Sequence, residues 1–310
     1  MSILKSALLA RGALFGAVVV GLIVLMALFA PLVSPYDPLR QNVNGLLSPP
    51  TLLHPFGTDN TGRDVLSRVV WGTRVSLEAG LVSVAIAMVV GCTIGLAAGY
   101  WGGRLDGVLM RLIDAVLSFP ALVLALALGA VLGAGLGGVL IALGVVYTPT
   151  FARLMRGQVL SVRTREFVHA ARVLGGADTW ILRRHILPNA ATPIVVQASL
   201  SVGFAILAEA SLSFLGLGVQ PPEPSWGSMI NAGRGYLQQA PWMVFGPGAA
   251  LFVTVLGLNF LGDGVRDALD PRVSIRARTR PSSARVGFGS RKAAALLPRA
   301  TRPGPRSRTA

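Results

Sequence analysis

The chain has 310 residues, of which 53% are hydrophobic and only 13% are charged, and its formal net charge at pH 7 is +15. Soluble domains carry about 25% charged residues, so this composition leaves too little polar surface for a water-soluble globule and indicates a membrane protein. The single cysteine, Cys92, excludes an intrachain disulfide and a cluster of thiolate ligands.

The first apolar segment, residues 13–33, follows Lys5 and Arg11. A signal peptide has an apolar core of about 7–15 residues and a cleavage site with small residues. This run is longer, at about 20 residues, and shows no clear cleavage pattern. We therefore expect a first transmembrane helix that is retained.

Five further segments have the length that a helix needs to cross a bilayer, about 17–25 mostly apolar residues. They lie at residues 76–100, 107–132, 137–156, 190–214 and 244–262. Pro120 lies within the third span, where it removes a backbone hydrogen bond, so a kink is expected there. The predicted fold class is an all-α membrane protein with about six transmembrane helices in one permease domain, residues 13–272.

The distribution of basic residues predicts the orientation. With the N-terminus inside, the cytoplasmic segments contain 23 of the 28 Lys and Arg residues. The sequence therefore places residues 1–12 and 273–310 in the cytoplasm. The basic tail at 273–310 has no acidic residue, and its composition predicts disorder. Because much of the net charge comes from this tail, the charge does not indicate nucleic-acid binding.

Small residues recur every four positions in two spans, which suits close packing of helices. The first stripe comprises Ser83, Ala87, Gly91, Gly95 and Gly99, and the second comprises Ala121, Ala125, Gly129, Gly133 and Gly137. We expect these stripes to pack within the chain rather than at a subunit interface.

Two long segments, residues 34–75 and 215–243, are expected outside. The first contains the stretch His54–Asp64 and, from Asp64 onward, a short apolar periodicity that suggests a surface helix. Aromatic and amphipathic pieces in both segments suit either a position at the membrane surface or a structured loop with no partner. The sequence leaves these alternatives open.

The inner loop is predicted to form a hairpin of two short helices, residues 163–188. The first helix runs from Glu166 to Leu174 and ends at Gly175, which tolerates a left-handed backbone. One face of it has residues spaced i, i+3, i+4 and i+7. These residues are Phe167, Ala170, Ala171 and Leu174.

The second helix of the hairpin is predicted from Asp178, as its N-cap, to Leu187, with Pro188 stopping it. A face of small residues on such a hairpin suits insertion into a groove of another protein. The same periodicity is equally consistent with a face that rests on the chain's own membrane domain.

At these residues the chain resembles the binding-protein-dependent importer permeases of the dipeptide, oligopeptide and nickel type. The signature of that family is Glu-Ala-Ala, three residues, Gly, and later Ile-x-Leu-Pro. It stands here as His169-Ala170-Ala171, Gly175 and Ile186-Leu187-Pro188. Residues 54–67, 215–227 and 261–272 are also similar to the family, so the resemblance covers roughly residues 13–272.

The resemblance implies an all-helical subunit of the bacterial inner membrane whose hairpin is the coupling element. Its partners would be a second permease that completes a heterodimeric pore, two ATP-binding-cassette ATPase subunits and an extracytoplasmic substrate-binding protein. The implied coupling residues are Glu166, Phe167, His169, Ala170, Ala171, Leu174, Gly175, Asp178, Leu187 and Pro188. His169 departs from the usual Glu, so a negative contact is lost or becomes sensitive to pH near neutrality.

No catalytic, cofactor-binding or metal-binding residues are expected in this chain. Its two lysines, Lys5 and Lys292, do not stand in a phosphate-binding loop. The three histidines lack the spacing of a zinc protease. We therefore expect a non-enzymatic subunit for which a partner hydrolyses ATP.

Two acidic residues within spans, Glu209 and Asp114, are candidates for the translocation path, because ionisable groups in spans usually face a pathway or a partner. Hydration near a membrane interface is the alternative for both. Peptides are the expected solute, with nickel complexes or another small solute as the alternative. Two other classes stay open: an ion-driven secondary transporter, which would show inverted repeats and broken helices, and a membrane-embedded assembly or signalling subunit without flux.

Overall fold

The computed structural model describes residues 11–269, and within them the regular structure is helical apart from one isolated bridge between Thr58 and Asp64. Predictions for residues 1–10 and for the basic tail at 273–310 lie outside the described residues. The α-helices are α2 (Arg11–Leu28), α3 (Ala30–Val33), α4 (Val65–Trp101), α5 (Gly103–Leu117), α6 (Ala121–Leu132), α7 (Leu136–Val162), α8 (Glu166–Val173), α9 (Asp178–Ile181), α10 (Leu187–Phe214), α11 (Trp226–Gly233) and α12 (Trp242–Leu269). A π-helical turn, Leu182–Ile186, joins α9 to α10.

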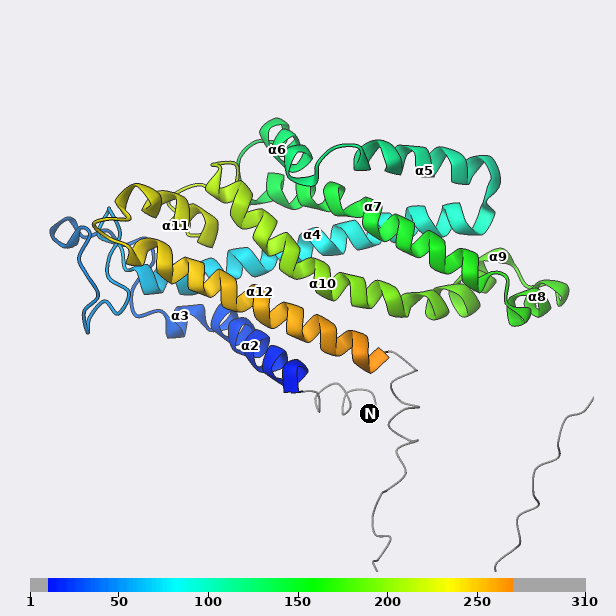
Figure 1. Cartoon of the computed structure of the whole chain (residues 1–310), viewed down its shortest axis with the longest axis horizontal. Coiled ribbons are helices and arrows are strands. Elements are labelled where there is room, and N and C mark those ends of the chain that lie inside the picture. Colours follow the sequence, from blue (N-terminus) through cyan, green and yellow to red (C-terminus); the bar gives the residue numbers. More distant parts are fainter. Residues whose placement is uncertain (1–10, 270–310) are drawn as a thin grey trace, which may run out of the picture. The chain divides into compact units, whose positions relative to one another are not determined.

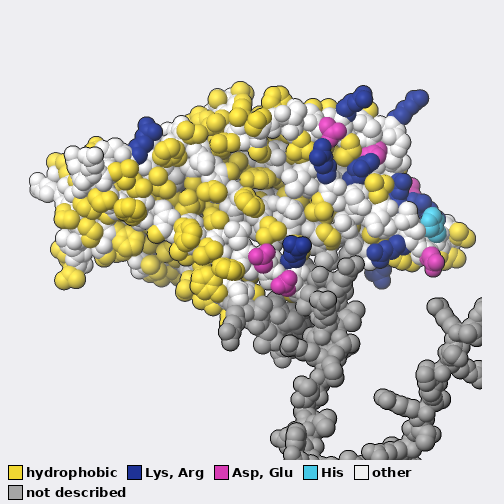
Figure 2. All heavy atoms as spheres, in the orientation of Figure 1, with side chains coloured by type: hydrophobic (Ala, Val, Ile, Leu, Met, Phe, Trp, Pro, Cys, Tyr) yellow, Lys and Arg dark blue, Asp and Glu magenta, His cyan; other side chains and the backbone are white. Residues whose placement is uncertain are grey.

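The helices run along one another in a bundle, with the long loop before α4 and helix α11 at one end and helices α8 and α9 at the other (Figure 1). We call these the loop end and the hairpin end. Apolar side chains cover the middle of the visible surface, whereas Lys and Arg side chains gather near the hairpin end (Figure 2). This distribution is that of a membrane protein with one strongly basic side.

Four continuous helical segments of residues 11–269 are long and apolar enough to cross a membrane: Val65–Trp101, Leu136–Val162, Asp178–Phe214 and Trp242–Ala268. The bent pair α5 and α6 makes a fifth span if the two are counted together. Helix α2 is apolar over Gly12–Leu28 but shorter than the others. The all-α membrane fold is therefore confirmed, and a count of six depends on α2 and the bent pair each crossing.

The predicted surface helix that begins at Asp64 is not a separate element, because it is the first part of α4. Asp64 is the N-cap of α4, and its carboxylate accepts hydrogen bonds from the Ser67 N–H at 2.7 Å and from the Ser67 hydroxyl at 2.6 Å. No helix-breaking residue separates Asp64 from residue 76, where the second transmembrane span is predicted to start. Gly72 remains helical, and its backbone packs against Trp226.

Pro120 causes a larger change than the kink that the sequence predicts. The axes of α5 and α6 meet at 90°. Residues Ser118 to Pro120 lie between these helices, and Pro120 is the N-cap of α6. A residue before proline is biased toward extended backbone, and proline has no N–H to continue the helix, so the chain leaves one helix and starts another.

The first small-residue stripe packs within the chain, as predicted. A Cβ atom added at Gly91 would lie 2.5 Å from the Thr148 carbonyl oxygen, and one at Gly99 would lie 2.8 Å from Val159 Cβ. At Gly95 the added atom would overlap the backbone of α7 at Ala152. The backbones of α4 and α7 therefore touch along the stripe, which forms the central helix contact of the bundle.

Only part of the second predicted stripe of small residues is buried. Ala125 and Gly129 are buried, whereas Ala121, Gly133 and Gly137 are exposed. The helical periodicity fails because α6 ends at Leu132, and the intervening glycines adopt positive φ before α7 begins.

Candidate functional site

The predicted hairpin, residues 163–188, forms at the end of the bundle opposite the long loop (Figure 1). Helix α8 ends in a Schellman turn. The Gly176 N–H donates to the Ala171 carbonyl at 3.0 Å, and the Gly175 N–H donates to the Arg172 carbonyl at 2.9 Å. Gly175 has a φ of +79°, which confirms the left-handed cap that the sequence predicts. A sharp reversal after α8 is therefore built into the sequence.

Helix α8 presents a different face from the one predicted. Val168 and Ala171 are buried, with exposed fractions of 0% and 7%, and they belong to the main apolar core of the chain. Ala170 is exposed, and Val173 and Leu174 are each 87% exposed. The predicted face is therefore split, because Ala171 packs against the chain's own domain while Ala170 and Leu174 are presented to solvent.

We call the exposed apolar residues of this helix and its C-cap the α8 tip. They are Phe167, Ala170, Val173 and Leu174. Glu166 and His169 are exposed on the same helix. The α8 tip is a small apolar surface at an otherwise basic end of the molecule, where contact with another protein would remove it from water.

Asp178 does not cap the second helix, because Ala177 occupies the N-cap position and no side-chain cap is formed. The Asp178 carboxylate instead accepts a hydrogen bond of 2.5 Å from the hydroxyl group of Tyr100, near the end of α4. The guanidinium group of Arg172 lies 5.4 Å from the centre of the Tyr100 ring. Tyr100 thus connects both short helices of the hairpin to α4.

Arg163 makes a second link to α4 by donating hydrogen bonds to the Gly99 and Tyr100 carbonyls at 2.8 and 3.2 Å. Sequence reasoning did not identify Tyr100 or Arg163 as part of this site. Their partners are distant in sequence, and no local pattern connects an aromatic residue near the end of one span with a hairpin almost eighty residues later.

The predicted stop at Pro188 is wrong, because helix α9 continues through the π-helical turn into α10. The Leu187 N–H donates to the Leu182 carbonyl, five residues back. The wider π turn brings the chain to Pro188 within the first turn of α10, where a missing N–H is tolerated. Leu187 and Pro188 are exposed, whereas Ile181 and Ile186 are fully buried. The second helix of the hairpin is therefore continuous with a candidate transmembrane helix.

Asp114 lies on α5 and pairs with Arg153 of α7 at 2.6 Å. Both side chains are more than half exposed. Nearby, the guanidinium group of Arg156 forms a bidentate ion pair with the carboxylate of Asp106, in which both N···O distances are 2.6 Å. Asp114 is thus paired with a basic residue of a neighbouring helix, and both its hydration at a membrane interface and its place in the translocation path remain predictions.

Glu209 is fully buried between α10 and α4. Its carboxylate accepts hydrogen bonds from the Ser213 hydroxyl at 2.6 Å and the Ser76 hydroxyl at 3.4 Å. These hydrogen bonds satisfy the buried carboxylate of Glu209 at the contact between α10 and α4. A role for Glu209 in the path stays a prediction that requires α4 and α10 to separate.

The loop end is a structured assembly. Trp226 is fully buried and donates its indole N–H to the Val69 carbonyl at 3.1 Å, while Trp242 donates to the Thr58 carbonyl at 3.0 Å. The Arg68 guanidinium donates to the carbonyls of Pro38 and Pro222 and so joins both long loops to α4. Both long loops are thus folded against α4, and whether they lie at the membrane surface remains a prediction.

An ion pair between Asp59 and Arg63, at 2.7 Å, closes the turn within the stretch His54–Asp64. Burial alone would raise the pKa of the Asp59 carboxyl, but hydrogen bonds from Arg63 and Thr61 and the charge of Arg63 lower it below its ordinary value of 3.8. This interaction stabilises the fold above pH 3.8 and is lost as the pH falls through the lowered pKa.

Two family models match the chain. One, described as the binding-protein-dependent transport system inner membrane component, matches residues 91–275. The other, described as the N-terminal TM domain of oligopeptide transport permease C, matches residues 10–50.

Similar proteins include the dipeptide transport system permease protein DppC of Alkalihalophilus pseudofirmus, which is 44% identical over 261 residues, covering 84% of this chain and 86% of that protein. The di/tripeptide transport system permease protein DppC of Pseudomonas aeruginosa is 45% identical over 269 residues, covering 85% of this chain and 89% of that protein.

Among solved structures, a chain of the inward-facing MetNI methionine ABC transporter aligns with a TM-score of 0.55 and 21% identity, covering 65% of this chain and 96% of that one. This likeness concerns the fold alone. The family match spans more than half of the chain and the sequence relatives span most of it. The chain therefore belongs to the family of binding-protein-dependent transport system inner membrane components, as a multi-pass subunit of the inner membrane.

Proposed function

We propose that this chain is one of two permease subunits that form the translocation pore of an ATP-driven peptide importer, and that the α8 tip couples the pore to an ATPase subunit. Family membership and relatives that are named for dipeptide and tripeptide transport support this proposal. The observation that carries it is the α8 tip: exposed apolar side chains on a short helix that a Schellman turn and Tyr100 hold in place.

Coupling requires that movement of the α8 tip is transmitted to the transmembrane helices. Two connections serve this purpose: the hydrogen bond from Tyr100 to Asp178 leads to α4, and the continuous helix from α9 leads to α10. Because Val168 and Ala171 are packed into the core, α8 moves together with the helices beneath it. ATP would be bound and hydrolysed by the partner, since the sequence has no phosphate-binding loop.

The remaining partners follow from this role. A second permease would complete the pore, two ATPase subunits would serve the two permeases, and an extracytoplasmic binding protein would deliver the peptide at the loop end. The loop end, which hydrogen bonds hold against α4, suits such a partner, because a preformed surface loses little conformational entropy on binding.

Topology gives the first test. In a Cys92→Ser background, Leu52→Cys should react with a membrane-impermeant maleimide in intact cells, and Ala177→Cys should react only after permeabilisation. Leu52 is fully exposed at the loop end and Ala177 is exposed in the hairpin turn. Labelling of position 177 from outside would place the hairpin on the wrong side for an ATPase.

Uptake tests the function. A strain that lacks its native peptide importers should accumulate a labelled dipeptide when it expresses this chain with the second permease, the ATPases and the binding protein. Replacement of the catalytic base in the ATPases should abolish uptake, and collapse of the ion gradients at constant ATP should not. Uptake that follows the ion gradient instead would identify a secondary transporter.

A further inference from the structure

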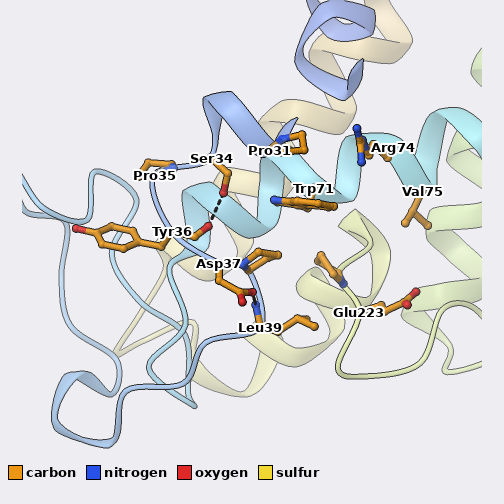
Figure 3. Close-up of a pocket in the computed structure, with 12 residues that line it drawn as sticks. Pro31, Ser34, Pro35, Tyr36, Asp37, Leu39, Trp71, Arg74, Val75 and Glu223 are labelled. Carbon is orange, nitrogen blue, oxygen red and sulfur yellow. Dashed lines mark hydrogen bonds between the residues drawn. The ribbon is translucent and has the colours of Figure 1, made fainter. Parts of the chain in front are cut away.

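A polar cavity of about 320 Å³ lies at the loop end, within the long loop that precedes α4. It is distinct from the larger cavity beside Trp71 that Figure 3 shows. The ring of Tyr36 points away from Trp71 (Figure 3) and packs instead against His54, with the ring centroids 4.8 Å apart. The side chains that the polar cavity brings together include those of Tyr36, Arg40, Gln41, Asn42, His54 and Asp64.

The imidazole ring of His54 is held in one orientation at this cavity. Its Nδ1 atom lies 2.9 Å from a carboxylate oxygen of Asp64, and Tyr36 packs on the ring. The other ring nitrogen, Nε2, is not buried and has no hydrogen-bond partner among the described residues. A carboxylate that engages one nitrogen fixes the ring and leaves the other nitrogen for a ligand.

The accessible charge of the cavity is positive. Arg40 is exposed and forms no ion pair within residues 11–269. The carboxylate of Asp64 is only 2% exposed, and it already accepts hydrogen bonds from the backbone N–H and the hydroxyl group of Ser67 in addition to its contact with His54. The cavity therefore suits an anionic group that contacts Arg40.

The neutral side chains of the cavity add hydrogen-bond donors. The amides of Gln41 and Asn42 follow Arg40 in the chain, and the Asn42 side-chain oxygen is already used as an acceptor for the Asn44 N–H at 3.2 Å. A carboxylate is an acceptor-only group that can take two hydrogen bonds from one guanidinium. Because the protonated imidazole donates from both nitrogens, a carboxylate at Nε2 would hold the His54 ring between two carboxylates.

The position of the cavity bears on where that carboxylate comes from. All of its lining residues lie between positions 36 and 64, so no residue of α7, α10 or α12 contributes. A solute on its way across the membrane must pass between the spans, whereas a protein that docks at the loop end meets this loop first. The cavity therefore favours a docking protein over the transported solute.

We propose that this cavity binds the carboxylate of an Asp or Glu side chain of the extracytoplasmic binding protein. This inference rests on the proposed function, which brings that protein to the loop end. The carboxylate accepts hydrogen bonds from the guanidinium group of Arg40 and from Nε2 of the protonated His54 ring. The C-terminal carboxylate of a peptide has the same chemistry, and the experiment separates the two sources.

A carbodiimide, which joins an amine directly to a carboxylate in contact with it, provides the test. Lys5 and Lys292 are the only lysines of the chain, so Arg40→Lys keeps the charge and places a single new amine at the cavity. The assembled transporter would be treated together with its binding protein, loaded with a labelled dipeptide. We expect the lysine at position 40 to become linked to one Asp or Glu of the binding protein, which peptide mass spectrometry identifies.

Arg234→Lys is the matched control, because Arg234 is an exposed arginine of the turn after α11 and lies outside the cavity. A link of equal yield from position 234 would overturn the proposal, as would a link only to the dipeptide or only within the chain. If the binding protein does not bind the parent transporter, the proposed function fails. If it binds but position 40 stays unlinked, this inference alone fails.

Affinity provides an independent measurement. The binding protein should bind Arg40→Gln about threefold to tenfold more weakly than the parent transporter, the effect of losing one hydrogen bond. His54→Asn should weaken binding similarly, since the asparagine amide can replace Nδ1 as the donor to Asp64 but lacks the second nitrogen. Unchanged affinity in both variants would contradict the proposal.

Discussion

Replacing Ala170 by tryptophan is expected to lower ATP-driven uptake strongly while leaving the chain folded in the membrane. Ala170 is exposed on α8, so the indole ring has space in the isolated chain. If the α8 tip is the coupling surface, as we propose, the ring would stand in the complex where the methyl group of Ala170 meets the ATPase. Forcing excess volume into a packed contact costs about 1–3 kcal/mol, and we expect uptake and co-purification with the ATPase to fall by about tenfold or more.

Ser161→Trp is the control for Ala170→Trp. Ser161 is exposed near the end of α7, outside the α8 tip, so the same ring should leave uptake unchanged there. Gly175→Val provides an independent route to the same loss, because the φ of +79° strains a β-branched residue although the surrounding space is open. Normal uptake and co-purification of Ala170→Trp would show that the ATPase binds elsewhere.

Gly95→Ala is expected to destabilise the whole bundle. The added methyl group would overlap the Ala152 backbone of α7, and backbone atoms cannot move aside as a flexible side chain can. Separation of α4 from α7 along the stripe should cost about 1–3 kcal/mol. The expected result is a lower midpoint of thermal unfolding for the purified protein and less protein in the membrane.

Gly107→Ala is the matched control, since Gly107 lies within α5 and an added Cβ meets no atom within 4 Å. Alanine is favoured over glycine within a helix by about 0.5–1 kcal/mol, so this variant should be at least as stable as the parent chain. Equal stability of Gly95→Ala and Gly107→Ala would show that α4 and α7 do not pack as described.

The sequence predicts the four continuous spans well because apolar length and small-residue spacing are local signals. The stripe from Ser83 to Gly99 and the left-handed cap at Gly175 both depend on spacing within one segment, and both are confirmed. Pro120 also gives a local signal, but its effect depends on the two residues before it and on neighbouring helices. The sequence thus predicts a kink where the chain makes a 90° turn.

The features that the sequence does not predict are those decided by packing. Helix α8 has two adjacent apolar faces, one with Val168 and Ala171 and one with Ala170 and Leu174, and periodicity alone does not show which is covered. Asp178 would suit an N-cap, yet its carboxylate meets Tyr100 because α4 ends beside it. The π turn before Pro188 likewise depends on how α9 is held against the core.

Cross-linking of two adjacent positions of α8 tests the coupling role most directly. In a Cys92→Ser background, Ala170→Cys and Ala171→Cys would each be treated with a short bifunctional maleimide in the assembled transporter, with a cysteine placed in the facing groove of the ATPase. Ala170 is exposed, whereas Ala171 is only 7% exposed and packs against the chain's own core. We expect position 170 to cross-link to the ATPase and position 171 to remain unlinked. Cross-linking at 171 but not at 170, or at neither position in an active transporter, would contradict the assignment of the α8 tip as the coupling surface.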